Sequence, residues 1–391
     1  MSVASPARFA SLLASALTIW WATTPALAQD RDALLRDPDD GAFDVSGFLS
    51  TAGGFLPLVM PITEPAVGYG AAGALAFFHR PEGWDIDAAR AAFDARERMA
   101  IPSVSVGAGM YTSNQSWANA AGHLGIWGGG RWRYTGAGAY LGLNLSVAQN
   151  VPGTGDVLID YDLDGWALTQ QLRYRIASTD FYVGARYDYL SMTTRFDSDA
   201  LAGEPPEREA SNAGAAVTLA YDSRNNTFTP DRGLFASLDT RRQDDVFGSD
   251  YDYWSGKLNV LGYFGPLNEL VVGLRGVAAY ATEGVPFWAK PSVRMRGVAA
   301  GRYTGEQTFT FESEIRWDFV RRWSVVGFGG SAVNLDQREA LDDFERWVGA
   351  GGVGFRYLLA RAYGIRGGLD FAYGEDGFAL YVTMGSAWMA F

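Results

Sequence analysis

The chain has 391 residues and a formal net charge of −12, with no cysteine and only 2 histidines. This composition excludes disulfide and thiolate chemistry and leaves little material for metal or general-base sites. The acidic balance also argues against nucleic acid as a partner, because neutralising phosphates requires a basic surface.

Residues 1–28 have the layout of a secretory signal peptide. A weakly basic start at Arg8 precedes an apolar stretch and the small-residue end Ala26-Leu27-Ala28, which predicts cleavage before Gln29. An uncleaved helical anchor is the alternative. Residues 29–51 are polar and too few for an independent fold, so we expect a periplasmic tail there.

The rest of the chain contains no apolar run of the roughly 18 residues that a membrane-spanning helix needs. The nearest candidate, 54–78, is interrupted by Glu64 and by helix-breaking prolines such as Pro61. The chain therefore either folds in water or crosses a membrane as strands.

Apolar residues recur with period two throughout 52–391, which is typical of strands. In 306–319, for example, Phe311 and Trp317 share one face while Glu312 and Arg316 share the other. We expect sixteen strands, at 52–63, 66–79, 101–112, 116–128, 131–148, 163–177, 179–197, 211–223, 232–243, 251–264, 268–282, 306–319, 323–335, 346–358, 361–374 and 377–391.

The connections between these strands largely alternate between tight turns and longer polar loops. That alternation and the even strand count are typical of outer-membrane barrels, in which apolar side chains face lipid and charged ones face the lumen. The sequence thus predicts an all-β fold, a 16-stranded antiparallel transmembrane β-barrel over 52–391. The long connector 80–100 is an exception, where we expect a solvated segment, with a short charged helix over 85–98 as the alternative.

Two further segments carry motifs. The first is Tyr221 to Gly233, whose Asp, Asn, Pro and Gly residues favour a turn stabilised by local hydrogen bonds. Its key positions are Asp222, Arg224, Asn225, Pro230 and Gly233. The second is Val293-Arg294-Met295-Arg296-Gly297, followed by Gly301-Arg302-Tyr303, inside the longest loop.

In this order and spacing, the two motifs resemble those of the BamA/TamA-type outer-membrane assembly superfamily (the bacterial surface antigen family). Thr63-Glu64-Pro65 and the terminal residues Met389 and Phe391 resemble that family too, the latter two its C-terminal insertion signal. The resemblance implies that a long extracellular loop, about 283–305, folds into the lumen. It also implies that Arg296, beside Gly297, pairs there with Glu314.

Strand alternation independently directs Glu314 and Glu312 into the lumen. The chain departs from the family pattern at Val298, where an aromatic residue is usual, and at 327–330, where an aspartate is usual. We therefore expect a lock that is weaker, or that is rebuilt through Glu312. The sequence also offers no room for the POTRA domains that collect clients in most members of the family.

These observations predict a bacterial outer-membrane barrel that assists insertion or translocation of protein or lipid. Gly and Pro in 52–63 would weaken the pairing of the first strand with the last, so that this seam could open sideways. Expected partners are outer-membrane lipid, lipopolysaccharide, client outer-membrane or secreted proteins and a separate periplasmic protein. A passive pore or a purely structural barrel is the alternative.

We expect no enzyme, no cofactor and no metal. A hydrolase would need a nucleophile within hydrogen-bond reach of a base, and neither His79 nor His123 lies in a recognisable catalytic motif.

Overall fold

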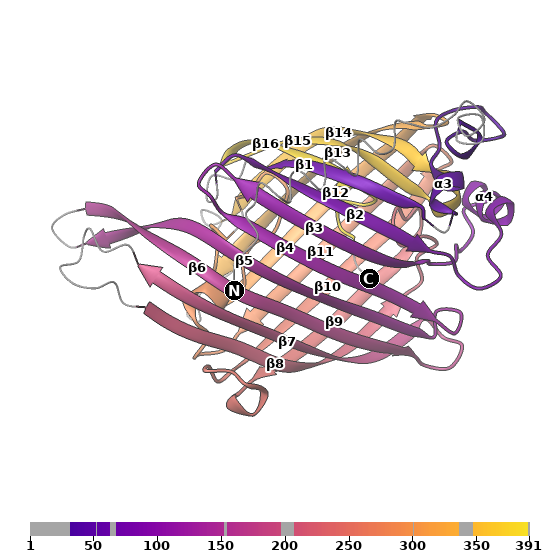
Figure 1. Cartoon of the computed structure of the whole chain (residues 1–391). Helices are drawn as coiled ribbons and strands as arrows, with labels where there is room; N and C mark the ends of the chain where they lie inside the picture. The colour runs from indigo at the N-terminus through magenta and orange to yellow at the C-terminus, as the bar shows by residue number, and fades with distance from the viewer. Residues whose placement is uncertain are drawn as a thin grey trace.

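The computed structural model describes residues 32–51, 53–62, 68–151, 155–196, 207–299, 301–335 and 347–389. The expected signal peptide, the Thr63-Glu64-Pro65 motif and Phe391 lie outside these residues. Within the described residues, sixteen strands follow one another in sequence order around one antiparallel sheet that curls into a nearly closed barrel (Figure 1). The predicted all-β, 16-stranded fold is confirmed.

The strands have the following bounds: β1 Phe55–Ile62, β2 Gly70–His79, β3 Ser103–Thr112, β4 Trp117–Trp127, β5 Trp132–Val151, β6 Gly155–Arg175, β7 Phe181–Phe196, β8 Glu207–Asp222, β9 Gly233–Gln243, β10 Tyr253–Leu267, β11 Leu270–Ala281, β12 Gln307–Val320, β13 Trp323–Leu335, β14 Val348–Ala360, β15 Ile365–Gly374 and β16 Gly377–Met384. Short helices lie between or before them: α3 Ser46–Leu49, α4 Ile86–Asp94, η3 Asp245–Phe247, η4 Phe287–Ala289 and η6 Arg361–Tyr363.

Side chains alternate across the wall of the barrel with their polarity inverted relative to a water-soluble sandwich. On β12, Arg316 is 5% exposed while the next residue, Trp317, is 53% exposed. Large apolar side chains cover the outside of most strands, and charged ones point into the lumen. An outward apolar surface of this kind matches a hydrocarbon environment.

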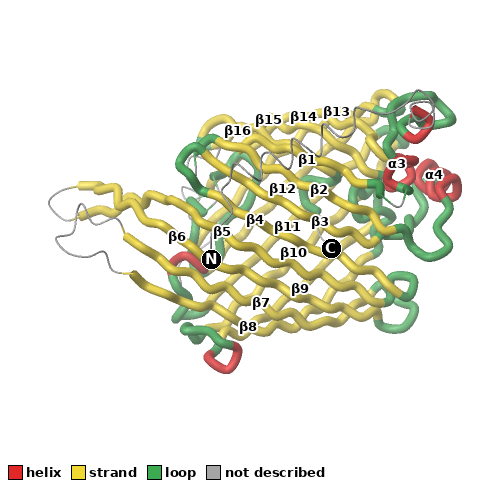
Figure 2. Tube along the Cα trace, in the orientation of Figure 1, coloured by secondary structure: helices red, strands yellow, loops and turns green. Residues whose placement is uncertain are grey.

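Helices α3 and α4 lie together at one end of the barrel, which we call the helical end (Figure 2). The opposite end, where residues 282–306 connect β11 to β12, is called the loop end. Within the described residues, no helix has the length and apolar character needed to span a membrane.

The connector after β2 is helical rather than the solvated segment we expected. Asp85 caps α4, because its carboxylate accepts hydrogen bonds from the backbone N–H groups of Asp87 and Ala88. The helix packs against η6, and Arg96 beyond it donates to the carbonyl of Asn268 at the β10–β11 turn. The charges of this connector therefore mediate tertiary contacts.

Strands β5 and β6 extend into residues 149–162, which we expected to form a loop between the strands at 131–148 and 163–177. Their ladder continues to the pair Val151 and Gly155, and Figure 1 shows both strands protruding past their neighbours at the loop end. Continued pairing satisfies the backbone N–H and C=O groups of this extension, which the sequence had assigned to a loop.

The last strand is shorter than predicted. It ends at Met384 instead of continuing to residue 391. The N–H of Gly385 donates to Arg366 (2.6 Å), and that of Ser386 donates to Phe228 (2.5 Å), so the chain turns into the lumen. Gly385 makes this turn with a φ of +79°, a conformation that glycine adopts easily.

The first and last strands leave a seam. They are neighbours in space (Figure 1), yet within the described residues no strand ladder joins β1 to β16. All pairs of strands that are consecutive in the sequence, from β1–β2 to β15–β16, are joined by ladders. The sheet is thus continuous except at this junction.

Candidate functional site

The loop that enters the lumen carries Arg296 at its centre. Its Nη1 donates to Asp370 of β15 at 2.8 Å, and its Nη2 lies 2.8 Å from Glu314 of β12. The contact with Glu314 is an ion pair without in-line hydrogen-bond geometry. The guanidinium also stacks 3.7 Å above the ring of Phe328 on β13, a favourable cation–π contact.

The structure thus brings the predicted residues Arg296 and Glu314 together, but it does not use Glu312 as we expected. Glu312 pairs instead with Arg275, which lies directly opposite it in the β11–β12 ladder. The second carboxylate comes from Asp370, and Phe328 occupies the stretch where the family has an aspartate. Alternation along β15 places Asp370 on the lumen side, but alternation alone does not identify its partner.

Gly297 allows the loop to reach the wall of the barrel. Its φ is +84°, and an added Cβ would lie 2.9 Å from the Cβ of Ala350. Its N–H donates to the hydroxyl of Tyr381 at 3.0 Å. Around it, an apolar cluster packs the loop against β13 and β14: Val293, Met295, Val298, Ala332 and Val348.

The same loop is tied to the turn between β15 and β16. The N–H of Ala299 donates to Asp376 at 2.8 Å, and Arg302 pairs with the same carboxylate at 2.5 Å. The hydroxyl of Tyr303 donates to Glu375 at 3.3 Å. The loop end of β16 is thus fixed to the lumen loop.

The segment after β16 fills part of the remaining lumen. Ser386 lies 3.0 Å from the Tyr263 hydroxyl, and Trp388 packs beside Tyr263 and near Arg296, in part over Gly273. A cavity of about 20 Å³ remains beside Tyr263 and Ser386, which is room for one water molecule. Met389, part of the predicted insertion signal, follows this segment and is exposed.

The predicted turn motif closes the lumen from the helical end. Asp222 accepts hydrogen bonds from Arg224 (2.8 Å) and Arg133 (2.6 Å). The Asn225 carboxamide accepts from the N–H groups of residues 231 and 232. Gly233 has a φ of +104°, and a Cβ there would lie 2.5 Å from the carbonyl of Ser223. Pro230 borders the small cavity.

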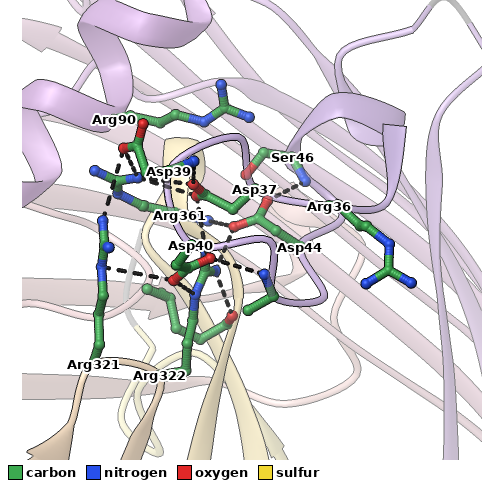
Figure 3. A network of polar contacts seen from close by, with 12 residues as sticks. Arg36, Asp37, Asp39, Asp40, Asp44, Ser46, Arg90, Arg321, Arg322 and Arg361 are labelled. Atoms are coloured by element: carbon green, nitrogen blue, oxygen red, sulfur yellow. Dashed lines mark hydrogen bonds and ion pairs between the residues drawn. The ribbon is translucent and has the colours of Figure 1, made fainter. Parts of the chain in front are cut away.

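A cluster of arginines and aspartates lies at the helical end, and sequence reasoning missed it (Figure 3). Arg322, in the β12–β13 turn, pairs with three carboxylates of the N-terminal segment. Its partners are Asp37 (2.8 Å), Asp40 (2.9 Å) and Asp44 (2.6 Å). The expected periplasmic tail is therefore folded against the barrel in 32–51.

Arg361, in η6, is the second centre of this cluster. It pairs with Asp37 (3.1 Å), with Asp39 (2.6 Å) and with Asp94 of α4. Hydrogen bonding by Arg322 lowers the pKa of Asp40 to about 2. The only sequence signals are the acidic run of residues 37–44 and the Arg321-Arg322 pair, which lie far apart in the chain.

An apolar cluster packs beneath these ion pairs. It joins the N-terminal segment, β1 to β4, the buried turn and η6, and its buried members are Val45, Leu49, Leu56, Ala76, Phe78, Val104, Leu124, Phe228, Ala360, Ala362, Tyr363 and Ile365.

The two histidines flank a serine on the outer wall. Ser105 Oγ lies 2.9 Å from His79 Nε2 and 2.9 Å from His123 Nδ1. Among the described residues, no carboxylate hydrogen-bonds to either imidazole, so the orienting group of a serine hydrolase triad has no counterpart there. The described residues also contain no group of His, Asp or Glu side chains that could hold a metal ion.

Comparison with known proteins supports the fold. No family model and no curated protein matches the sequence. The structure is similar to BamA from Haemophilus ducreyi lacking POTRA domains 1-3, with a TM-score of 0.54 and 12% identity over 85% of this chain and 70% of that one.

Two further similar structures are CdiB from Acinetobacter baumannii and CdiB from Escherichia coli. The first has a TM-score of 0.54 at 11% identity and covers 84% of this chain and 59% of its own. The second has a TM-score of 0.55 at 12% identity and covers 84% and 61%. The chain thus has a barrel fold of the BamA and CdiB kind.

Proposed function

We propose that this chain is a BamA/TamA-type barrel of the bacterial outer membrane that assists insertion or translocation of protein or lipid. The helical end would face the periplasm and the loop end the exterior. The observation that carries the proposal is the seam, where β1 and β16 lie together without a ladder. A separate periplasmic protein would supply client capture.

Prolines in β1 support an edge that can be opened. Pro57 and Pro61 both lie within the ladder to β2, and proline is accommodated in a strand only where its nitrogen faces away from the paired neighbour. Both nitrogens therefore face β16, and two donors are missing from that side. An incoming client strand could pair with the carbonyl-rich edge by strand addition.

Three segments that lie in the lumen disfavour the alternative of a passive pore. They are the loop around Arg296, the segment around Trp388 and the buried turn after Asp222, and the last two border a cavity of about 20 Å³. A purely structural barrel would share these features, so the seam is the place to test.

Cysteine pairs across the seam test the proposal in a chain that has no cysteine of its own. Leu56→Cys with Thr383→Cys would lock the helical end, and Met60→Cys with Ala379→Cys would lock the loop end. Ala387 is unsuitable for such a pair, because it packs in the lumen beside Trp388. Leu58→Cys with Ala74→Cys, opposite each other in the β1–β2 ladder, is the matched control.

We expect oxidation of at least one seam pair to reproduce the outer-membrane assembly or permeability defect of a gene deletion, and reduction to reverse it. The β1–β2 control should form its disulfide without a defect. If every seam lock forms and none impairs the cell, the opening mechanism is wrong. Steady single-channel conductance of the purified barrel would then favour the pore.

A further inference from the structure

The two chain segments that flank the β1–β2 hairpin converge on one arginine. Asp37 and Asp39 precede β1, Asp94 follows β2, and all three pair with Arg361. Arg361 belongs to η6, between β14 and β15, on the other side of the seam. These contacts therefore bridge the seam at the helical end, passing β16 by.

Further contacts of the N-terminal segment strengthen this bridge. Asp44 accepts from Arg322 at 2.6 Å and from the N–H of Arg361 at 3.1 Å. The N–H of Val45 donates to the carbonyl of Leu359 at 2.8 Å, and Ser46 accepts from the N–H of Ala362 at 3.0 Å. Side chains and backbone thus both hold this segment on the β14–β15 turn.

Burial makes these ion pairs expensive to break. The side chains of Arg322 and Arg361 are 6% and 5% exposed, and those of Asp37 and Asp44 are fully buried. Removing one partner from a buried pair leaves an uncompensated charge. The apolar cluster beneath adds Leu56 of β1 and Phe78 of β2 to the same unit as Tyr363 of η6.

At the loop end, the contacts run differently. Asp376, in the β15–β16 turn, is held by Ala299 and Arg302 of the lumen loop. Gly297 of that loop also donates to Tyr381 of β16. These contacts fix β16 to the lumen loop and do not bridge it to β1.

We propose that residues 37–49, α4 and Arg361 form a clasp that keeps the helical end of the seam closed, so that the seam opens from its loop end. The β1–β2 hairpin would pivot about the clasp while β16 stays on the lumen loop. The inference rests on the proposed sideways opening, and it assigns that opening a direction and a restraint.

The clasp is tested by labelling a single cysteine at the buried position Leu56, in the purified full chain. Leu56 is 7% exposed, so Leu56→Cys should react slowly with a water-soluble maleimide. Asp39→Asn with Asp94→Asn removes two half-exposed carboxylates from Arg361 and should raise the labelling rate several-fold. Asp32→Asn, which breaks the exposed pair with Arg36 in the same segment, is the matched control and should leave the rate unchanged.

The direction is tested by comparing the two seam locks in cells. We expect the Met60–Ala379 lock to impair function and the Leu56–Thr383 lock to leave it intact. Impairment by the Leu56–Thr383 lock would overturn the direction, and unchanged labelling in the double variant would overturn the clasp. Faster labelling with no defect from either lock would retain the clasp and reject the proposed function.

Discussion

At the scale of single residues, the lumen loop depends on one arginine and one glycine. Arg296 meets carboxylates from two different strands, and Gly297 takes the backbone conformation that brings it there. In the interior of a barrel, an arginine of this kind is stable only while its charge is compensated. Charge compensation and backbone geometry can be tested separately.

Gly297→Ala should weaken the loop more than Gly301→Ala. Both glycines have positive φ, at +84° and +75°, but only the Cβ at Gly297 would meet a neighbour, at 2.9 Å, whereas that at Gly301 has open space. A left-handed conformation costs an L-residue roughly 1–2 kcal/mol, so this cost is shared and the difference reports the clash. Thermal unfolding in detergent and trypsin cleavage within 283–305 would measure it. Equal effects would contradict the close packing.

Arg296→Ala should destabilise the barrel by roughly 3–5 kcal/mol, because it leaves Glu314 and Asp370 without this cation. Arg302→Ala removes an arginine whose side chain is 61% exposed and should cost about 0–1 kcal/mol. Urea unfolding of the two variants in detergent would compare them. A small loss in Arg296→Ala would show that Arg356, the other partner of Asp370, compensates the charge alone.

At the scale of elements, the chain after Met384 contains two features that the sequence placed in one strand, a residue that packs in the lumen and a predicted insertion signal. The strand stops at Met384 and Trp388 packs in the lumen, whereas the sequence indicated an insertion signal ending at Phe391. Packing in the folded barrel and recognition during assembly can therefore depend on different residues of one short segment.

Trp388→Ala should lower the stability of the folded barrel by roughly 3–5 kcal/mol, as expected when a buried aromatic side chain is removed. Phe391→Ala should reduce assembly in cells and leave the stability of the refolded protein nearly unchanged. Refolding in detergent, followed by urea unfolding, measures the first effect, and the folded fraction in outer membranes measures the second. The separation of tasks would be refuted if both variants failed in both assays.

At the scale of the whole molecule, segments close the barrel at its two ends in different ways. The loop end is closed by a loop packed on apolar side chains, and the helical end by ion pairs above an apolar cluster. Both ends contain carboxylates, and the lowered pKa values of Asp37 and Asp40 make the helical end sensitive to acid.

The helical end should loosen in acid. The pKa of Asp40 is about 2 against an ordinary 3.8, chiefly because Arg322 hydrogen-bonds to its charged form. The pKa of Asp37 is also lowered, because hydrogen bonds from Asp39 and Arg361 outweigh the effect of burial. A lowered folded pKa means that this stabilisation is complete above the ordinary pKa and is lost as the pH falls towards 2.

Pepsin cleavage of 32–51 at decreasing pH would follow this loss, and it should accelerate between about pH 4 and 2. Pepsin should cleave Asp40→Asn faster than the unchanged chain at pH 4, and the cleavage rate of this variant should increase less on acidification. An unchanged pH profile in Asp40→Asn would show that Asp40 does not carry the acid response.

The same chemistry explains which predictions from sequence were wrong. Alternation placed Glu312 and Glu314 on the lumen side, but Glu312 forms its ion pair with Arg275, which lies opposite it in the ladder, and not with Arg296. We expected a solvated segment at 80–100, with a helix over 85–98 as the alternative, yet a helix forms over 86–94 and its Asp94 pairs with Arg361. In both cases the residue that forms the ion pair lies far away in the sequence, so local patterns could not identify it.

The sequence by itself determined that this chain forms sixteen strands, which face of each strand is apolar, and where the glycine-dependent loop and turn lie. Those features follow from period-two alternation and local backbone preference, which act between near neighbours. Only the tertiary structure decided that Asp370 pairs with Arg296, that the chain turns into the lumen at Gly385, and that the N-terminal segment pairs with Arg361. These outcomes depend on which groups the closing barrel brings within contact distance, because an ion pair forms through space and leaves no periodic trace in the chain.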